Sequence, residues 1–150
     1  MKIAVMGEIH PDGWKIFEEN NLESFELLNF EENNLKKELS EVDAILLRTA
    51  RLSNDVLSYC NKLKIVSRHG VGYDNVNVDY LNKKNIALGI TSTSNAVSVA
   101  EHVLTSFLYL SKNIHLSDKL TREGRFNDKS SLPNFFELYQ KNIVIFGFGR

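Results

Sequence analysis

A turn with two glycines around one valine, Gly70-Val71-Gly72, is the sharpest local feature that could do chemistry. Such a turn exposes successive backbone N–H groups, and these form a concavity suited to a carboxylate or a phosphate. The same residues can also be an ordinary tight turn before a helix that is capped by Asn75 or Asn77. The sequence therefore predicts either an anion-binding loop or a structural turn at this position.

A second glycine-rich segment ends the chain. The apolar residues 143–146 run into Gly147, Phe148, Gly149 and Arg150. A strand that leads into Gly-x-Gly is the opening of a dinucleotide-binding fingerprint, in which glycine lets the backbone approach a pyrophosphate and a helix N-terminus follows. The third glycine, the helix and the ribose-binding acid of that fingerprint do not occur within the 150 residues.

Two polar side chains could also contact a small anionic ligand. Arg48 offers a forked donor that matches a carboxylate in bidentate fashion, although a surface ion pair is the more frequent fate of a single arginine. Asn95 could donate its amide N–H to a ligand oxygen, and capping of a helix N-terminus is an equal explanation. Ser98 and Glu101 have the spacing of a capping box, so we assign them mainly to helix initiation.

Other kinds of catalytic site have little support in the sequence. The four histidines show no metal-ligand spacing, and none has an obvious nucleophile beside it. No cysteine–histidine cluster, serine nucleophile elbow or complete phosphate-binding loop with lysine and a hydroxyl occurs. We therefore predict neither a metal site nor a catalytic histidine in these residues.

The composition sets further limits. A hydrophobic content of 43% allows one real core and the edge of a second, and a formal charge of −1 without a basic stripe argues against a nucleic-acid surface. The single cysteine, Cys60, cannot form an internal disulfide, and we expect a small buried side chain in a reducing compartment. The N-terminal apolar stretch is too short for a signal peptide, and no apolar run reaches membrane-spanning length. We expect a soluble cytoplasmic protein with no membrane partner.

Short apolar runs that alternate with helical patterns must position these residues. Strands are predicted at residues 3–6, 25–30, 44–47, 63–66, 86–90 and 143–146, and helices at residues 12–20, 31–39, 54–60 and 76–84. Most of the strands are continuous apolar runs, which is typical of parallel strands covered on both faces. The alternation predicts an α/β fold with a doubly wound parallel sheet, and its first five strands suffice for a flavodoxin-like domain.

In an open parallel sheet, ligands bind beyond the carboxyl ends of the strands. In this chain those ends carry residues 7–10, Arg48 with its neighbour, residues 68–75 and residues 91–95. We expect all four segments to face one cleft, which the turn at Gly147 could close from the next domain.

Residues 95–122 predict one long helix that differs from the others. Its apolar side chains lie on two stripes, so such a helix must be buried on most sides, wedged between two domains or two subunits. A polar stretch from residue 122 to residue 134 follows as a loop. A domain boundary therefore falls within the helix or just after it.

With these residues in hand, the chain resembles the first half of a D-isomer-specific 2-hydroxyacid dehydrogenase. That family includes phosphoglycerate dehydrogenase, hydroxypyruvate and glyoxylate reductases, D-lactate dehydrogenase and NAD-dependent formate dehydrogenase. The matching stretches occur in the family's order at residues 46–49, 63–79, 95–103 and 147–150. Gly-Val-Gly-x-Asp-Asn followed by Asn-x-x-Ser-Val-Ala-Glu is far more specific than a lone glycine motif.

The resemblance implies a role for each candidate residue. The backbone at Val71 and Gly72 would bind the substrate carboxylate, and Val71 would also lie against the nicotinamide. Asn95 would reach the substrate, and Arg48 would line its pocket. The pyrophosphate cradle of NAD or NADP, with NAD favoured, would begin with Gly147, Gly149 and Arg150.

The resemblance also implies three parts. Residues 1–95 would be a substrate-binding domain, residues 96–134 an interdomain and dimerisation helix with its loop, and residues 135–150 the start of a Rossmann NAD(P)-binding domain. The family's catalytic arginine, glutamate and histidine come from the cofactor domain, beyond Arg150. We therefore expect no catalytic residue in this segment and no activity from these 150 residues by themselves.

The expected function is thus that of the N-terminal part of an oxidoreductase, a homodimer that transfers a hydride between NAD(P)H and a 2-oxo or 2-hydroxy carboxylic acid of the D series. The alternative is a non-catalytic flavodoxin-like module that binds or dimerises. A receiver-like version of that module is disfavoured, because the places where a receiver carries its acids hold Gly7-Glu8 and Arg48-Thr49.

Overall fold

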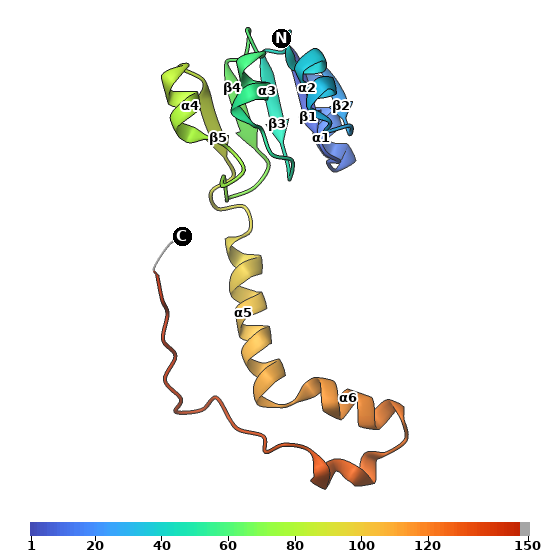
Figure 1. Ribbon diagram of the computed structural model, residues 1–150. Coiled ribbons are helices and arrows are strands. Elements are labelled where there is room, and N and C mark those ends of the chain that lie inside the picture. The colour runs from blue at the N-terminus through green and yellow to red at the C-terminus, as the bar shows by residue number, and fades with distance from the viewer. Residues whose placement is uncertain (148–150) are drawn as a thin grey trace. The chain divides into compact units, whose positions relative to one another are not determined.

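The computed structural model describes residues 1–147 of the chain. It divides into two compact units, Met1–Ser94 and Asn95–Arg150. The first unit is an α/β domain in which strands and helices alternate along the chain, and the second is helical (Figure 1).

The first unit contains a parallel sheet of five strands in the order β2-β1-β3-β4-β5. This is the flavodoxin-like order, so the predicted fold class is confirmed. The strands are β1 (Lys2–Met6), β2 (Glu23–Leu27), β3 (Ala44–Leu47), β4 (Ile65–Arg68) and β5 (Ala87–Ile90). The helices between them are α1 (Pro11–Glu19), α2 (Glu32–Leu39), α3 (Asn54–Ser58) and α4 (Val78–Lys83).

Pairing between neighbours sets strand bounds that the apolar pattern alone placed differently. The strand predicted at residues 25–30 ends at Leu27, because its one partner β1 ends at Met6 directly opposite. The strand predicted at residues 63–66 is displaced to Ile65–Arg68, since its partner β3 begins at Ala44 opposite Ile65. Leu63 is buried all the same, in the turn that precedes the strand.

Hydrophobic side chains are buried on both faces of the sheet, and the cluster on one face is larger than the cluster on the other. The larger cluster packs α2, α3 and α4 against one face. On the other face, Ile3, Val5 and Ala44 are buried with partly buried side chains of α1 packed against them. Cys60 belongs to the larger cluster, where its thiol donates to the Val56 carbonyl at 3.4 Å and burial raises its pKa to about 11. The expectation that Cys60 is a small buried side chain is confirmed.

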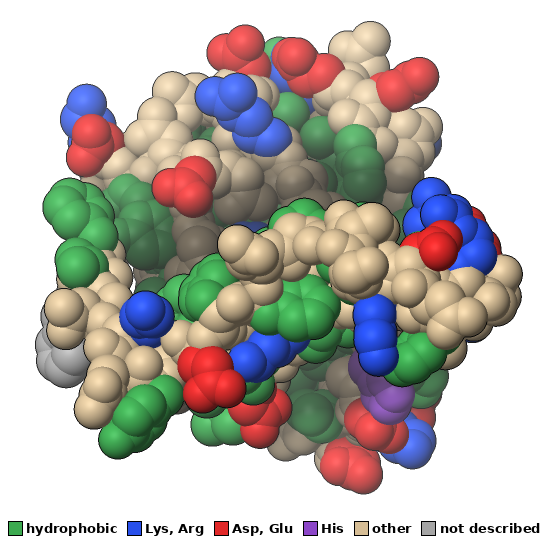
Figure 2. All heavy atoms as spheres, turned by 90° about the horizontal axis from the view of Figure 1, so that it is seen from below, with side chains coloured by type: hydrophobic (Ala, Val, Ile, Leu, Met, Phe, Trp, Pro, Cys, Tyr) green, Lys and Arg blue, Asp and Glu red, His purple; other side chains and the backbone are tan. Residues whose placement is uncertain are grey.

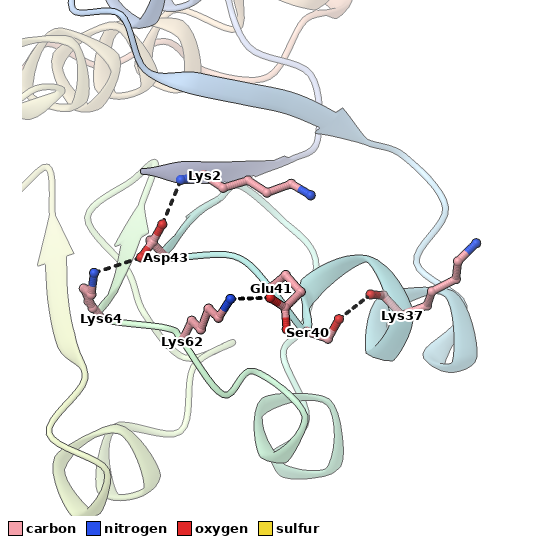
Figure 3. Close-up of polar contacts among 7 residues, drawn as sticks. All are labelled: Lys2, Lys37, Ser40, Glu41, Asp43, Lys62 and Lys64. Carbon is pink, nitrogen blue, oxygen red and sulfur yellow. Dashed lines mark hydrogen bonds and ion pairs between the residues drawn. The ribbon is translucent and has the colours of Figure 1, made fainter.

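A carboxylate ties together the amino ends of three strands (Figure 3). Asp43, just before β3, accepts hydrogen bonds from the backbone N–H of Lys2 at 2.9 Å and from Lys64 Nζ at 2.8 Å. Lys2 begins β1 and Lys64 precedes β4. An exposed ion pair between Lys62 and Glu41 lies beside this contact. The Lys64 hydrogen bond and then the Lys2 N–H hold the pKa of Asp43 below its usual value.

The second unit contains α5 (Ala96–Ser111), α6 (Ile114–Arg122) and a 3-10 helix, η1 (Phe126–Ser131). The prediction of one unbroken helix over residues 95–122 is wrong. The chain bends between α5 and α6, where Asn113 has a φ of 47°, in the left-handed region (Figure 1). Asparagine tolerates that conformation better than most residues, and the Asn113 carbonyl then accepts the Leu116 N–H at 3.0 Å to start α6. No helix among residues 1–147 is long and apolar enough to cross a membrane.

Much of the apolar surface of α5 is exposed. Among its residues Ser111 is the buried one, whereas Val97 is 72% exposed and Leu104 is 58% exposed. Within residues 1–147 no other element covers these side chains, and the prediction that this helix is wedged between two domains or two subunits stays a prediction. Hydrophobic side chains are also visible on the surface in Figure 2. A helix this apolar needs a partner surface, which these residues do not themselves supply.

Two local predictions in the second unit are also wrong. The helix α5 begins right after Asn95, so Ser98 and Glu101 lie inside it rather than forming a capping box at its start. Residues 143–146 are not a strand. A strand needs a hydrogen-bonded partner, and the described residues of this unit contain no other strand, so Val144 is 89% exposed.

The substitution Asp43→Asn should lower the melting temperature of the 150-residue chain at neutral pH by a few degrees. The folded pKa of Asp43 lies below its unfolded value, so its stabilisation is present at higher pH and is lost as the pH falls through the folded pKa. The difference from the wild type should therefore shrink as the pH falls from about 5, just above the unfolded pKa, through the lower folded pKa. Circular dichroism melts across this range would measure it.

The matched control is Glu41→Gln, which removes an exposed carboxylate from the same edge. Exposed pairs contribute little, so its melting temperature should stay near the wild-type value. Equal melting temperatures for Asp43→Asn and the wild type at pH 7 would contradict this role.

Candidate functional site

The four segments predicted to meet lie side by side at the carboxyl edge of the first unit's sheet. The strand order places the ends of β1, β3, β4 and β5 next to one another. Backbone hydrogen bonds continue the pairing just beyond the strand ends, from Gly7 N to Leu27 O (3.3 Å), Arg48 N to Met6 O (3.1 Å), His69 N to Leu47 O (2.8 Å) and Thr91 N to Gly70 O (3.2 Å). These bonds fix where each loop leaves the sheet.

The loop after β4 is held at its start while its middle stays open. The Gly70 N–H donates to the Arg68 carbonyl at 2.8 Å, and the Gly70 carbonyl accepts the Thr91 N–H at 3.2 Å. Within residues 1–147, the backbone N–H groups of Val71 and Gly72 donate to no other group. Val71 is 38% exposed and Gly72 is also exposed. Two successive amides therefore have no acceptor among residues 1–147 and belong to exposed residues.

The helix after this loop has its own cap. Asn77 accepts the Tyr80 N–H at 3.0 Å and caps α4, so of the two predicted caps Asn77 is confirmed. Asn75 instead donates its side-chain amide to the Ala50 carbonyl at 2.7 Å, and its own carbonyl accepts the Leu52 N–H at 3.4 Å. The cap of α4 therefore involves neither the Val71 N–H nor the Gly72 N–H. Asn75 joins the loop after β4 to the loop after β3.

A polar hollow opens between these two loops. It has a volume of about 550 Å³ and is lined by residues 51–55 and 74–77. Its walls carry Arg51, Asp55 and Asp74. The hollow has room for a small polar molecule, and its lining residue Asp74 lies two positions after Gly72 in the sequence.

Arg48 lies at the switch point of the sheet. The connection after β1 returns to β2 on one side, whereas the connection after β3 leads to β4 on the other, and ligand sites form where the connections diverge in this way. The Arg48 side chain is exposed, and its Nη1 donates to the Glu8 carbonyl at 2.7 Å. Gly7 has a φ of 105°, and a Cβ on it would lie 3.3 Å from Arg48 Cβ, so glycine permits this close approach. Within the described chain Arg48 forms no ion pair, so its charge is not neutralised there.

Sequence reasoning did not single out Arg68, the last residue of β4. Its side chain is partly buried, and its Nη1 donates to the His69 carbonyl at 2.7 Å and to the Leu47 carbonyl at 3.4 Å. Its Nε is buried without a partner among residues 1–147. A charged residue two positions after the apolar run that ends at Val66, and two positions before Gly70, was the signal that could have found it.

The remaining predicted site residues belong to the second unit. Asn95 occupies the N-cap position of α5, but its side chain makes no capping hydrogen bond. The capping explanation for Asn95 is therefore not supported by the structure. Gly147 has a φ of 88°, a left-handed conformation that favours glycine, and nothing lies within 4 Å of where a Cβ would be. Gly149 and Arg150 lie outside the described residues.

A metal site has no counterpart in the part of the chain from residue 1 to residue 147. No group of three or more histidine, cysteine, aspartate or glutamate side chains there could hold an ion.

Comparison with known proteins places the chain in a family. The model of the D-isomer specific 2-hydroxyacid dehydrogenase catalytic domain matches residues 3–149. The chain belongs to this family. The resemblance inferred from the motifs at residues 46–49, 63–79 and 95–103 is thereby confirmed.

Curated relatives are D-3-phosphoglycerate dehydrogenases. That of Methanocaldococcus jannaschii is 30% identical over 152 residues, covering 100% of this chain and 28% of that protein. That of Mycobacterium bovis is 39% identical over 111 residues, covering 73% of this chain and 21% of that protein. The match thus covers between 21% and 28% of the length of these curated relatives.

Solved structures of related dehydrogenases share the fold. The NAD-dependent formate dehydrogenase of Staphylococcus aureus, in complex with NAD, matches with a TM-score of 0.71 and 27% identity, over 87% of this chain and 44% of that one. The NADPH-dependent glyoxylate/hydroxypyruvate reductase of Sinorhizobium meliloti, in complex with NADP and malonate, has a TM-score of 0.75. It is 22% identical over 88% of this chain and 41% of that one, which supports the fold alone. The two neighbours bind NAD and NADP respectively.

The substitution Asn75→Ala should lower the free energy of unfolding by about 1–2 kcal/mol, because it removes the bond to the partly buried Ala50 carbonyl. Urea denaturation of the 150-residue chain would measure this change. Asn82→Ala, an exposed position in α4, is the matched control and should stay within about 0.5 kcal/mol of the wild type. A loss for Asn75→Ala no larger than that of the control would disprove the link between the loops.

Proposed function

We propose that this chain forms the substrate-binding part of an oxidoreductase that transfers a hydride between NAD(P)H and a 2-oxo or 2-hydroxy carboxylic acid of the D series. Membership of the dehydrogenase family supports the reaction class. The observation that carries the proposal is the pair of unpaired, accessible amides at Val71 and Gly72 at the carboxyl edge of the sheet. The lone buried thiol of Cys60 is consistent with a cytoplasmic location.

The two amides suit the carboxylate that such acids have in common. Each carboxylate oxygen can accept one N–H, and hydrogen bonds to a charged group contribute about 1.5–3 kcal/mol each. The bonds of Gly70 to Arg68 and Thr91 hold the start of the loop, so little ordering is required when the ligand binds. Arg48 adds a positive charge at the neighbouring strand ends. In this proposal Arg48 and Asn95 also contact the substrate.

The described residues that would approach the cofactor fit a dinucleotide. Gly147 has the backbone conformation of a glycine-rich turn with open space around it, which suits a nearby pyrophosphate. The exposed side chain of Val71 offers an apolar surface to a nicotinamide ring. NAD or NADP, when bound, supplies or accepts the hydride, and we favour NAD. In this proposal Gly149 and Arg150 continue the pyrophosphate turn.

We further propose that residues 1–95 are the substrate domain, that residues 96–134 connect the domains and dimerise, and that residues 135–150 begin the cofactor domain. The exposed apolar side chains of α5 support a second copy of the chain as the partner. They also favour the second candidate function, a module that dimerises without chemistry. Carboxylate binding at residues 71 and 72 distinguishes the two functions.

The amide resonances of Val71 and Gly72 should shift saturably when glyoxylate or D-glycerate is titrated into the ¹⁵N-labelled chain. Glycolamide, which lacks the negative charge, is the control ligand and should leave both resonances unchanged. NADH should show negligible affinity for these residues alone, because they supply only the opening of its site. Carboxylate shifts confined to other residues, or tight NADH binding, would refute the proposal.

The purified chain should self-associate through α5. Replacing Leu104, which is 58% exposed, by aspartate should shift sedimentation toward the monomer, because a charge cannot be buried in an apolar interface without a large penalty. Asn82→Asp places the same charge on an exposed position of α4 and should sediment like the wild type. Monomeric wild-type chain at all concentrations would rule out this interface.

A further inference from the structure

The side chain of Arg68 bridges two segments that approach the unpaired amides. Through Nη1 it donates to the Leu47 carbonyl, at the end of β3, and to the His69 carbonyl, in the loop after β4. The Leu47 carbonyl also accepts the His69 N–H at 2.8 Å. One guanidinium nitrogen and one backbone N–H therefore converge on the same acceptor, which fixes the path of the chain directly before the two-glycine turn.

The guanidinium also packs flat against Gly70. A Cβ on Gly70 would lie 2.9 Å from Nη1, 3.1 Å from Cζ and 3.2 Å from Nη2 of Arg68. The space that a side chain at residue 70 would require is thus taken by the arginine. On its other side, the Gly70 carbonyl accepts the Thr91 N–H at 3.2 Å. Residue 70 is therefore confined between Arg68 and the end of β5.

The stability of the fold does not by itself explain an arginine at residue 68. Its Nε is buried with no partner among residues 1–147, and an unpaired buried N–H costs free energy. Within the same residues no carboxylate pairs with its charge. An apolar side chain of similar volume would pack at this position without either cost. An apolar side chain would, however, lack the planar fork of donors and the unneutralised charge of Arg68.

We propose that Arg68 is a positioning residue for the anion site. Its guanidinium sets the conformation of residues 69–72 in which the N–H groups of Val71 and Gly72 have no acceptor among residues 1–147, and its charge adds to the attraction for a carboxylate. Arg68 acts through the loop and makes no contact with the reacting atoms. The part of this inference that concerns a carboxylate rests on the proposed function, whereas the hold on the loop does not.

The test compares Arg68→Lys, Arg68→Met and Gly70→Ala with the wild type, using the ¹⁵N-labelled 150-residue chain. Lysine keeps the charge but has no fork, methionine has neither, and alanine at residue 70 displaces the guanidinium while Arg68 remains. Lys62→Met removes a charge from the opposite edge of the sheet and is the control. The first measurement, without ligand, is the chemical shift and the hydrogen exchange of the Val71 and Gly72 amides, with Val66 and Leu81 reporting whether the core is retained.

In the three test variants the Val71 and Gly72 amides should move while the core amides do not, and Lys62→Met should match the wild type. The second measurement is the affinity for glyoxylate. It should fall about tenfold in Arg68→Lys and Gly70→Ala, as for the loss of one charge-assisted contact, and further in Arg68→Met. The gap between Lys and Met isolates the charge, which a merely structural role would not produce.

The two measurements separate the hypotheses. Loop amides that stay unchanged in Arg68→Lys and Gly70→Ala would overturn the positioning role, as would wild-type glyoxylate affinity in all three variants. A wild-type chain that shows no response to glyoxylate, with loop amides that still move in the variants, would refute the proposed function and support the hold of Arg68 on the loop.

Discussion

The hydrogen bonds that extend the parallel sheet past the end of β4 are the constraint on which the candidate site depends. His69 donates back to β3, and the Gly70 carbonyl accepts from the residue after β5. Between them these bonds use the polar groups at the start of the loop and leave the next two N–H groups without partners among the described residues. The loop is thus rigid where it leaves the sheet and unsatisfied where a ligand can reach it, which is the combination that preorganised binding requires.

The charged side chains at the two edges of the sheet have different kinds of partner. At the amino edge, Asp43 is paired with Lys64 and Glu41 with Lys62. At the carboxyl edge, Arg48 and Arg68 donate to backbone carbonyls, which satisfies donors without cancelling charge. The same sheet therefore has ion pairs that fasten its strands at one edge and, at the other, two arginines without a carboxylate partner among residues 1–147.

Local patterns in the sequence predicted the structural elements that depend on short-range interactions. Continuous apolar runs predicted a parallel sheet, and β3 lies at the predicted residues 44–47 because both of its neighbours pair over that whole length. The bend at Asn113 and the hold of Arg68 on Gly70 depend on a backbone conformation and a contact that no periodicity encodes. The strand predicted at residues 143–146 failed for a different reason, since a strand exists only with its partner.

That unpaired segment has a practical consequence. Residues 143–146 are apolar, rich in β-forming side chains and without charge, and they lie extended and uncovered. A stretch of this kind is a template onto which another chain can add in cross-β fashion. Lys141 is the nearest charged residue before it, so this stretch is an aggregation-prone segment when the polypeptide is concentrated.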